Sequence, residues 1–248
     1  MPRGAVVPAL TSRTCVPILP WGAKFMEGSG KMKTVVVGGH SRKIGKTSLM
    51  VGLIRELKSF HWTAVKITQH CPGVSSPGKK ADDSTPTERT VVLSEENNPH
   101  GRGDTSRFLA AGAKRSLWLR VQRGHLAQAH PMLVEALCGD EFVMIESNSI
   151  LDFLSPVAYV VVLDGLKRDF KTSARRFLER ADALVPVESG LGNRPWPAVN
   201  PRGLPKKPVF AVSHRDYFNP ELCRFIQQKL DLADGELCSE GPSNLSGR

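Results

Sequence analysis

One stretch of the chain, Lys33 to Met50, has the residue types and spacing of a phosphate-binding loop. An apolar, β-branched run over 34–37 leads into two glycines, a short polar loop, and then Gly45-Lys46-Thr47 at the start of an apolar-periodic helix. Backbone N–H groups at the start of a helix point toward an anion, and the positive end of the helix dipole favours it. We therefore predict a nucleoside triphosphate site in which Lys46 reaches the β- and γ-phosphates and the Thr47 hydroxyl binds Mg²⁺.

The residues expected to contact the nucleotide are those of the loop and the first helical turn. They are Gly39, His40, Ser41, Arg42, Lys43, Ile44, Gly45, Lys46, Thr47 and Ser48. The motif G-x-x-x-x-G-K-[ST] has its first glycine where this chain has His40, but two glycines come immediately before it and keep the turn tight. The alternative is a coincidental Gly-Lys-Thr at a helix start. The strand and helix signals flank the loop where the motif demands them, which favours the phosphate loop.

Two acidic residues are candidates for the second half of such a site. Glu146 follows the apolar run FVMI (142–145) at its C-terminal end, where a carboxylate that positions Mg²⁺ or water belongs. We predict that Glu146 and Lys46 carry the chemistry. Asp104 opens a predicted helix after two polar loops, and as a helix N-cap it has a purely structural explanation.

The second predicted strand ends in Lys66-Ile67-Thr68-Gln69-His70, close to the phosphate loop in a parallel sheet. Lys66 could bind a further phosphate or an anionic substrate, and it could equally lie at the surface. His70 could bind a metal or carry a proton, but a lone histidine is more often a bystander.

A β-sheet would position these residues, and the sequence predicts the strands of such a sheet. Strand signals lie at residues 34–37, 62–67, 90–93, 116–121, 142–145, 157–163, 183–187 and 209–212. Helical periodicity lies at residues 47–59, 104–113, 125–137, 172–180 and 220–230. This alternation predicts a three-layer α/β fold: a mainly parallel sheet covered by helices on both faces, with ligands at the C-terminal strand ends.

Composition limits the classes of partner. The formal net charge of +10 favours anionic ligands. The basic residues are scattered and only 6% of residues are aromatic, so there is no platform for stacking bases, which argues against nucleic acid. Five dispersed cysteines without a C-x-x-C pair indicate reduced thiols and a cytoplasmic location. No apolar run is long enough to cross a membrane.

The predicted domain boundaries follow composition. Residues 1–32 contain Pro and Gly and lack a periodic apolar face, so we expect a disordered extension, with Met26 or Met32 as an alternative start. They could also imitate a weak targeting segment. The nucleotide-binding domain is expected over 33–232, and a Gly- and Ser-rich disordered tail over 233–248.

The order VVVGGHSRKIGKTSL, AVKITQH, GDTSRFLAAGA and FVMIESNS resembles the molybdopterin-guanine dinucleotide biosynthesis protein B (MobB) family of P-loop NTPases, from about Lys33 to Asp164. The phosphate loop is the most specific part of the resemblance. It implies a P-loop GTPase-type fold, a metal site formed by Thr47, Glu146 and Asp104, and a cleft that includes Lys66 and His70. The resemblance also implies GTP rather than ATP, and this preference depends on the resemblance alone, since the chain has no N-K-x-D guanine signature.

Three functions remain open at this point. The first is a nucleotide-binding accessory protein with slow GTP hydrolysis, whose partners would be molybdopterin or a protein of molybdenum-cofactor biosynthesis, with a homodimer as one assembly. The second is a small-metabolite kinase, with an acceptor pocket formed by the loops between 70 and 103. The third is a protein that binds nucleotide without turnover.

Overall fold

The strand that leads into the phosphate loop lies inside the sheet, between β5 (Phe142–Glu146) and β6 (Ala158–Asp164). The fold is described from a computed structural model, which places residues 32–71, 90–188 and 207–239; these residues belong to one compact unit. All seven residues of β1 (Lys33–Gly39) are buried, as expected for a β-branched run inside a parallel sheet. The proposed extension over 1–32 falls almost entirely outside the described residues.

The sheet has eight strands in the order β3-β4-β2-β5-β1-β6-β7-β8. The other strands are β2 (Thr63–His70), β3 (Val91–Glu95), β4 (Arg115–Gln122), β5 (Phe142–Glu146), β6 (Ala158–Asp164), β7 (Ala183–Glu188) and β8 (Val212–Ser213). All neighbours are parallel except β3, which pairs antiparallel with β4 at the edge. The register places Val37 of β1 beside Glu146 of β5, and Glu146 beside Lys66 of β2, so two site residues lie at the edge of the sheet where β1 leads into the loop.

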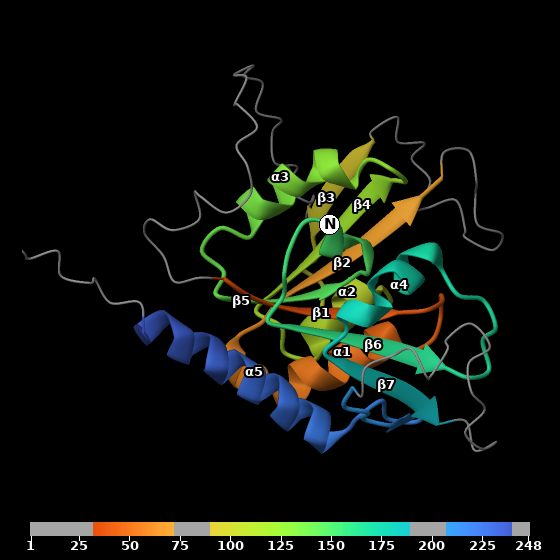
Figure 1. The fold of residues 1–248 in the computed structure, drawn as a ribbon. Helices are drawn as coiled ribbons and strands as arrows, with labels where there is room; N and C mark the ends of the chain where they lie inside the picture. Colours follow the sequence, from red (N-terminus) through yellow and green to blue (C-terminus); the bar gives the residue numbers. More distant parts are fainter. Residues whose placement is uncertain (1–31, 72–89, 189–206, 240–248) are drawn as a thin grey trace, which may run out of the picture. The chain divides into compact units, whose positions relative to one another are not determined.

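Helices cover both faces of the sheet, which gives the predicted three-layer α/β P-loop fold (Figure 1). The helical elements are α1 (Lys46–Glu56), η1 (Lys58–Phe60), α2 (Asp104–Ala110), α3 (Leu126–Ala136), η3 (Ser149–Asp152), α4 (Thr172–Phe177), η4 (Leu178–Arg180) and α5 (Pro220–Ser239). Side chains of α1, α2 and α5 pack with Val35 and Val37 on one face. Side chains of α3 and α4 pack with Val36 on the other face. Successive side chains of β1 thus enter the hydrophobic cores on opposite faces of the sheet.

The element ends differ from the predicted ones in a few places. The last strand, β8, lies at the edge of the sheet and pairs only over Val212–Ser213, with an isolated bridge at Val209. The helix predicted to end at residue 230 continues to Ser239, so the domain end predicted at 232 lies inside α5. A single glycine such as Gly235 costs a helix only about 1 kcal/mol and does not by itself end it. In the part of the chain that the structure describes, no helix has the length and apolarity to span a membrane.

Candidate functional site

A hydrogen bond from the Lys46 side chain spans the loop between β1 and α1. Helix α1 begins at Lys46 after Gly45, whose φ of 89° is the left-handed conformation that favours glycine. The Lys46 ammonium donates a hydrogen bond to the Ser41 carbonyl across the loop, at 2.8 Å. The helix has neither a side-chain cap nor an acidic residue in its first turn, so within the described part of the chain no carboxylate caps its leading N–H groups.

The two glycines before the loop are required by close neighbours. A Cβ atom on Gly38 would lie 2.2 Å from Asn148 Oδ1, and one on Gly39 would lie 2.7 Å from Ile44 Cδ1. The buried Asn148 amide accepts from the Gly39 N–H and donates to the Gly39 carbonyl, each at 2.9 Å. Asn148, just after β5, therefore fixes the path of the chain into the loop.

His40 stands where the motif has its first glycine, and its fully buried side chain points away from the loop interior. Its Nε2 lies 3.3 Å from the Lys167 carbonyl, its ring packs 5.2 Å from that of Phe170, and its own carbonyl accepts from the Lys171 N–H. The Ser41 hydroxyl donates to the Asp169 carboxylate. Burial lowers the pKa of His40, which keeps the ring neutral at this contact.

The loop tolerates histidine at position 40 because its left-handed residues are elsewhere. Among the described loop residues, positive φ falls on Lys43 (54°) and Gly45 (89°). We call the residues that hold the loop from behind, Asn148, His40 and the segment 167–171, the loop clamp. No sequence pattern predicted the contacts of the loop clamp, since the segment 167–171 has the composition of a polar connection.

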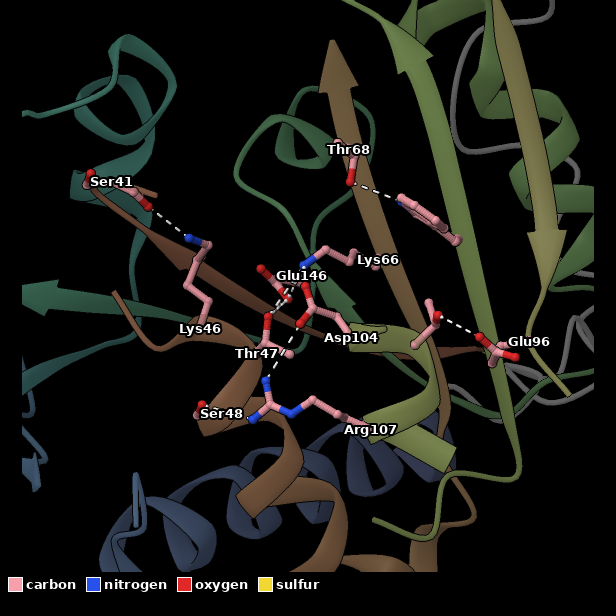
Figure 2. Close-up of polar contacts among 12 residues, drawn as sticks. Ser41, Lys46, Thr47, Ser48, Lys66, Thr68, Glu96, Asp104, Arg107 and Glu146 are labelled. Atoms are coloured by element: carbon pink, nitrogen blue, oxygen red, sulfur yellow. Dashed lines mark hydrogen bonds and ion pairs between the residues drawn. The ribbon is translucent and has the colours of Figure 1, made fainter. Parts of the chain in front are cut away.

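On the other side of the loop, four side chains meet that we call the ion cluster: Thr47, Lys66, Asp104 and Glu146 (Figure 2). The Thr47 hydroxyl donates to Glu146 Oε2 at 2.7 Å. Lys66 Nζ lies 3.1 Å from the same Glu146 oxygen, 2.5 Å from Asp104 Oδ2 and 3.4 Å from Thr47 Oγ1. Glu146 contacts Thr47 directly, whereas Asp104 reaches it only through Lys66.

Arg107 extends the ion cluster and was not predicted from the sequence. It comes one turn after Asp104 in α2, and its guanidinium lies 3.6 Å from Asp104 Oδ1 and donates to Ser48 Oγ at 3.1 Å. This contact ties α2 to the first turn of α1. An i, i+3 pair of Asp and Arg on one helix face was the signal that could have found it.

Other predicted residues lie away from these contacts. Arg42 and Lys43 are exposed on the loop, and His70 is exposed at the end of β2, four residues beyond Lys66. The backbone of His70 belongs to the β2–β4 pairing, and its carbonyl accepts from the Arg123 N–H. The structure therefore does not bring His70 into the ion cluster.

The electrostatics of the site favour an anion. Burial lowers the pKa of Lys46 to about 8; Glu146 opposes this shift, and Lys171 and Lys66 add to it. The pKa of Lys171 is also lowered, by burial and by Arg42. Burial lowers the pKa of Lys66 too, but the charges of Glu146 and Asp104 outweigh it and raise the value. Several cations thus surround one buried carboxylate, an arrangement that an anionic ligand would stabilise.

The residues that could hold a metal are few. In the described ranges, no three His, Cys, Asp or Glu side chains gather as a metal site would need. Thr47, Glu146 and Asp104 offer a hydroxyl and two carboxylates, all oxygen donors. Mg²⁺ is commonly held by one or two carboxylates with substrate phosphates completing its shell, so this small set fits Mg²⁺ bound together with a phosphate ligand.

Comparison with solved structures finds distant similarities. HypB from Helicobacter pylori in complex with nickel has a TM-score of 0.42 and 14% identity, over 86% of this chain and 91% of HypB. The MobB homolog from Bacillus stearothermophilus has a TM-score of 0.38 and 13% identity, over 82% and 99%. LpxK from Aquifex aeolicus in complex with ATP has a TM-score of 0.42 and 17% identity, over 73% of this chain and 53% of LpxK. Scores this low carry no argument about ligand or activity.

No protein-family model matches the chain, and the comparison with curated proteins finds no match. The assignment of the fold therefore depends on the molecule itself. A mostly parallel sheet covered on both faces, with a phosphate-type loop joining its central strand β1 to α1, makes this a three-layer α/β P-loop fold.

Proposed function

We propose that this chain binds a nucleoside triphosphate, with Mg²⁺, in the loop between β1 and α1. The observation that carries the proposal is the 2.7 Å hydrogen bond from Thr47 to Glu146. These residues are 99 positions apart in the chain, yet the hydroxyl suited to Mg²⁺ and the strand-end carboxylate suited to the same ion meet at one edge of the sheet. A coincidental Gly-Lys-Thr would have no reason to face such a carboxylate.

The loop interior supports a phosphate ligand independently. The first turn of α1 has no side-chain cap, and Lys46 reaches across the loop above it. Phosphate oxygens would accept from the N–H groups of residues 44–47 and pair with the Lys46 ammonium. Lys171, held by its N–H bond to the His40 carbonyl, adds positive charge on the clamp side.

Thr47, Glu146 and Asp104 would hold Mg²⁺, which when bound neutralises charge on the phosphates. Glu146 is 8% exposed at its side chain and would hold the metal or a water at a fixed position. Lys46 would neutralise the transferring phosphoryl group, and Lys66 would contact phosphate or an anionic substrate. With few groups positioned to activate water, we propose weak intrinsic hydrolysis.

The finer assignments depend on the sequence resemblance to MobB. We propose GTP as the preferred nucleotide, with ATP as the alternative, and a role in maturation of the molybdenum cofactor. Molybdopterin or a protein of that pathway would be the partner, in the cytoplasm, and the chain would form a homodimer. His70, exposed beyond Lys66, is available to a substrate but has no contact with the ion cluster.

A binding panel tests the proposal directly. The purified chain is titrated with GTP and ATP, each with Mg²⁺, with and without molybdopterin, and binding is followed by calorimetry. We expect binding of at least one triphosphate, and tighter binding of GTP than of ATP. Absence of binding to both would contradict the phosphate-loop assignment.

Glu146→Gln separates binding from turnover. Because the loop and Lys46 would hold the phosphates, the variant should bind triphosphate nearly as tightly as the wild type does. Its rate of phosphate release should be lower by a factor of about ten or more. Arg224→Gln, on the exposed face of α5, is the matched control that changes a charge far from the loop in sequence. Equal loss of binding and turnover in Glu146→Gln would assign the carboxylate to binding alone.

A metabolite kinase is the second candidate, and the exposure of Asp104 favours it. Its side chain is 38% exposed, whereas that of Glu146 is 8% exposed, so the ion cluster opens to solvent through Asp104. A carboxylate in that position could accept a proton from a substrate hydroxyl. Release of nucleoside diphosphate that depends on an added acceptor would distinguish a kinase from a hydrolase.

A further inference from the structure

The ammonium group of Lys66 lies among the oxygen atoms that would hold the divalent cation. Its Nζ is 2.5 Å from Asp104 Oδ2, 3.1 Å from Glu146 Oε2 and 3.4 Å from Thr47 Oγ1 (Figure 2). Thr47 Oγ1 and Glu146 Oε2 are themselves only 2.7 Å apart. The three oxygens therefore surround one position, and the Lys66 ammonium occupies that position.

We propose that Lys66 and a divalent cation exchange at these three oxygens, so that Lys66 acts as a built-in competitor of Mg²⁺. Mg²⁺ binds oxygen at 2.0–2.1 Å, closer than an ammonium does, so the ion and the lysine would not share the oxygens. The inference extends the proposed triphosphate site, since it concerns the metal of that site.

The buried charge of Glu146 explains why a lysine occupies this position when no metal is bound. Glu146 is almost completely buried, and a buried carboxylate without a partner is strongly unfavourable. Lys66, 18% exposed, supplies that partner. Asp104 is bound on both oxygens, Oδ2 by Lys66 and Oδ1 by Arg107 at 3.6 Å, so it stays near the cluster when either cation leaves.

The exchange predicts that metal and triphosphate enter together. A divalent ion alone must displace Lys66 and gains only three protein oxygens. A triphosphate supplies further oxygen ligands to the ion and also a new anionic partner for the displaced ammonium. Binding of metal without nucleotide should therefore be weak in the wild type, and the two ligands should bind cooperatively.

The test measures binding of Mn²⁺ alone, from the paramagnetic resonance signal of the free ion, to the full chain without nucleotide. In Lys66→Met the ammonium is lost and the length of the side chain is kept, so Mn²⁺ should bind about tenfold more tightly than to the wild type, or better. The double variant Lys66→Met/Glu146→Gln should lose this gain. Lys58→Met, an exposed lysine of η1, removes the same charge elsewhere and should not change Mn²⁺ binding.

Thermal unfolding provides a second readout that also reports folding. Lys66→Met leaves Glu146 without its cation, so the variant should be destabilised, and Mn²⁺ should raise its Tm more than that of the wild type. Lys66→Gln serves as the second variant if Lys66→Met does not fold. Equal Mn²⁺ affinity in the wild type and both variants, or an equal gain in Lys58→Met, would overturn the proposal.

The outcome is independent of the nucleotide panel. If no triphosphate binds but Lys66→Met gains Mn²⁺ affinity, the proposed function fails and the exchange stands. If triphosphate and Mg²⁺ bind and Lys66→Met gains nothing, the exchange fails alone.

Discussion

The loop clamp and the ion cluster hold opposite sides of the same loop by different means. The inner contacts of the clamp use buried neutral groups, the Asn148 amide on Gly39 and the His40 ring, although the segment 167–169 that His40 contacts is itself exposed. The ion cluster uses charges, and its outer member Asp104 is 38% exposed. Neutral buried hydrogen bonds keep one geometry because breaking them leaves unpaired polar groups, whereas ions exchange partners with water and with other ions. The difference suggests that the clamp sets the shape of the loop and that the ion cluster responds to ligands.

The largest effect is expected at Lys46, which lies between the two sides. Lys46→Met should abolish the rise in Tm that GTP or ATP with Mg²⁺ gives the wild type, because it removes the charge-assisted bonds to phosphate. The unliganded variant should unfold at the same temperature or a few degrees higher, since burial of the ammonium disfavours its charged form. An undiminished ligand-induced shift would contradict the role of Lys46.

The clamp is broken most directly by Asn148→Ala. The substitution leaves the Gly39 N–H and carbonyl buried without their partners, so the free energy of unfolding should fall by about 2–4 kcal/mol in urea titrations. Tyr159→Phe is the control: its hydroxyl reaches Asn148 Oδ1 at 3.3 Å, and its loss should cost about 1 kcal/mol or less. A similar small effect in both variants would mean that the amide does not hold the loop.

The pH dependence of binding sharpens the role of charge. Phosphate binds the protonated form of Lys46, whose pKa in the unliganded protein is about 8. Below pH 8 the lysine is already protonated; above it, binding must take up a proton, so affinity should fall by up to about tenfold per pH unit. Calorimetric titrations at pH 7 and pH 9, each in two buffers of different ionisation enthalpy, measure both the loss and the proton uptake. Affinity that is constant over this range would contradict the prediction.

The smallest effect is expected at the exposed edge of the ion cluster. Asp104→Asn removes ion pairs to Lys66 and Arg107, and the free energy of unfolding should fall by about 1 kcal/mol or less at about 0.1 M salt. The wild type and the variant should converge at about 1 M salt, where exposed charges are screened. A larger loss that salt does not change would show that Asp104 belongs with the buried, fixed part of the site.

The sequence predicted most of the fold because the signals are local. The β-branched run of β1, the alternation of β4 and the apolar period of α1 each mark an element within a few residues. The fold class is confirmed. The predicted end of the last helix at residue 230 was wrong: α5 continues to Ser239, into the segment whose glycine and serine content predicted a disordered tail.

The candidate site divides in the same way. Lys46, Thr47 and Glu146 could be named from the sequence, because a loop before a helix and a carboxylate after an apolar strand are local patterns, and the parallel register then brings them to one edge. The functional roles of these residues stay predictions. Asn148 and the segment 167–171 carry no such pattern, since each acts through a partner distant in the chain. Arg107 carries only its i, i+3 spacing from Asp104, which does not reveal its contact with Ser48.

Local patterns in the sequence therefore specify which elements form and which residues lie at their ends beside the ligand edge. The way in which the loop is held became visible only in the folded molecule: His40 turns into the clamp, Asn148 binds the backbone of Gly39, and Lys66 lies among the oxygens of Thr47, Asp104 and Glu146. The two kinds of feature differ in the sequence separation of the residues that interact. Backbone conformation and amphipathic period are set by neighbours along the chain, whereas hydrogen bonds and ion pairs between strand ends depend on the order of the strands in the sheet, which no local pattern encodes.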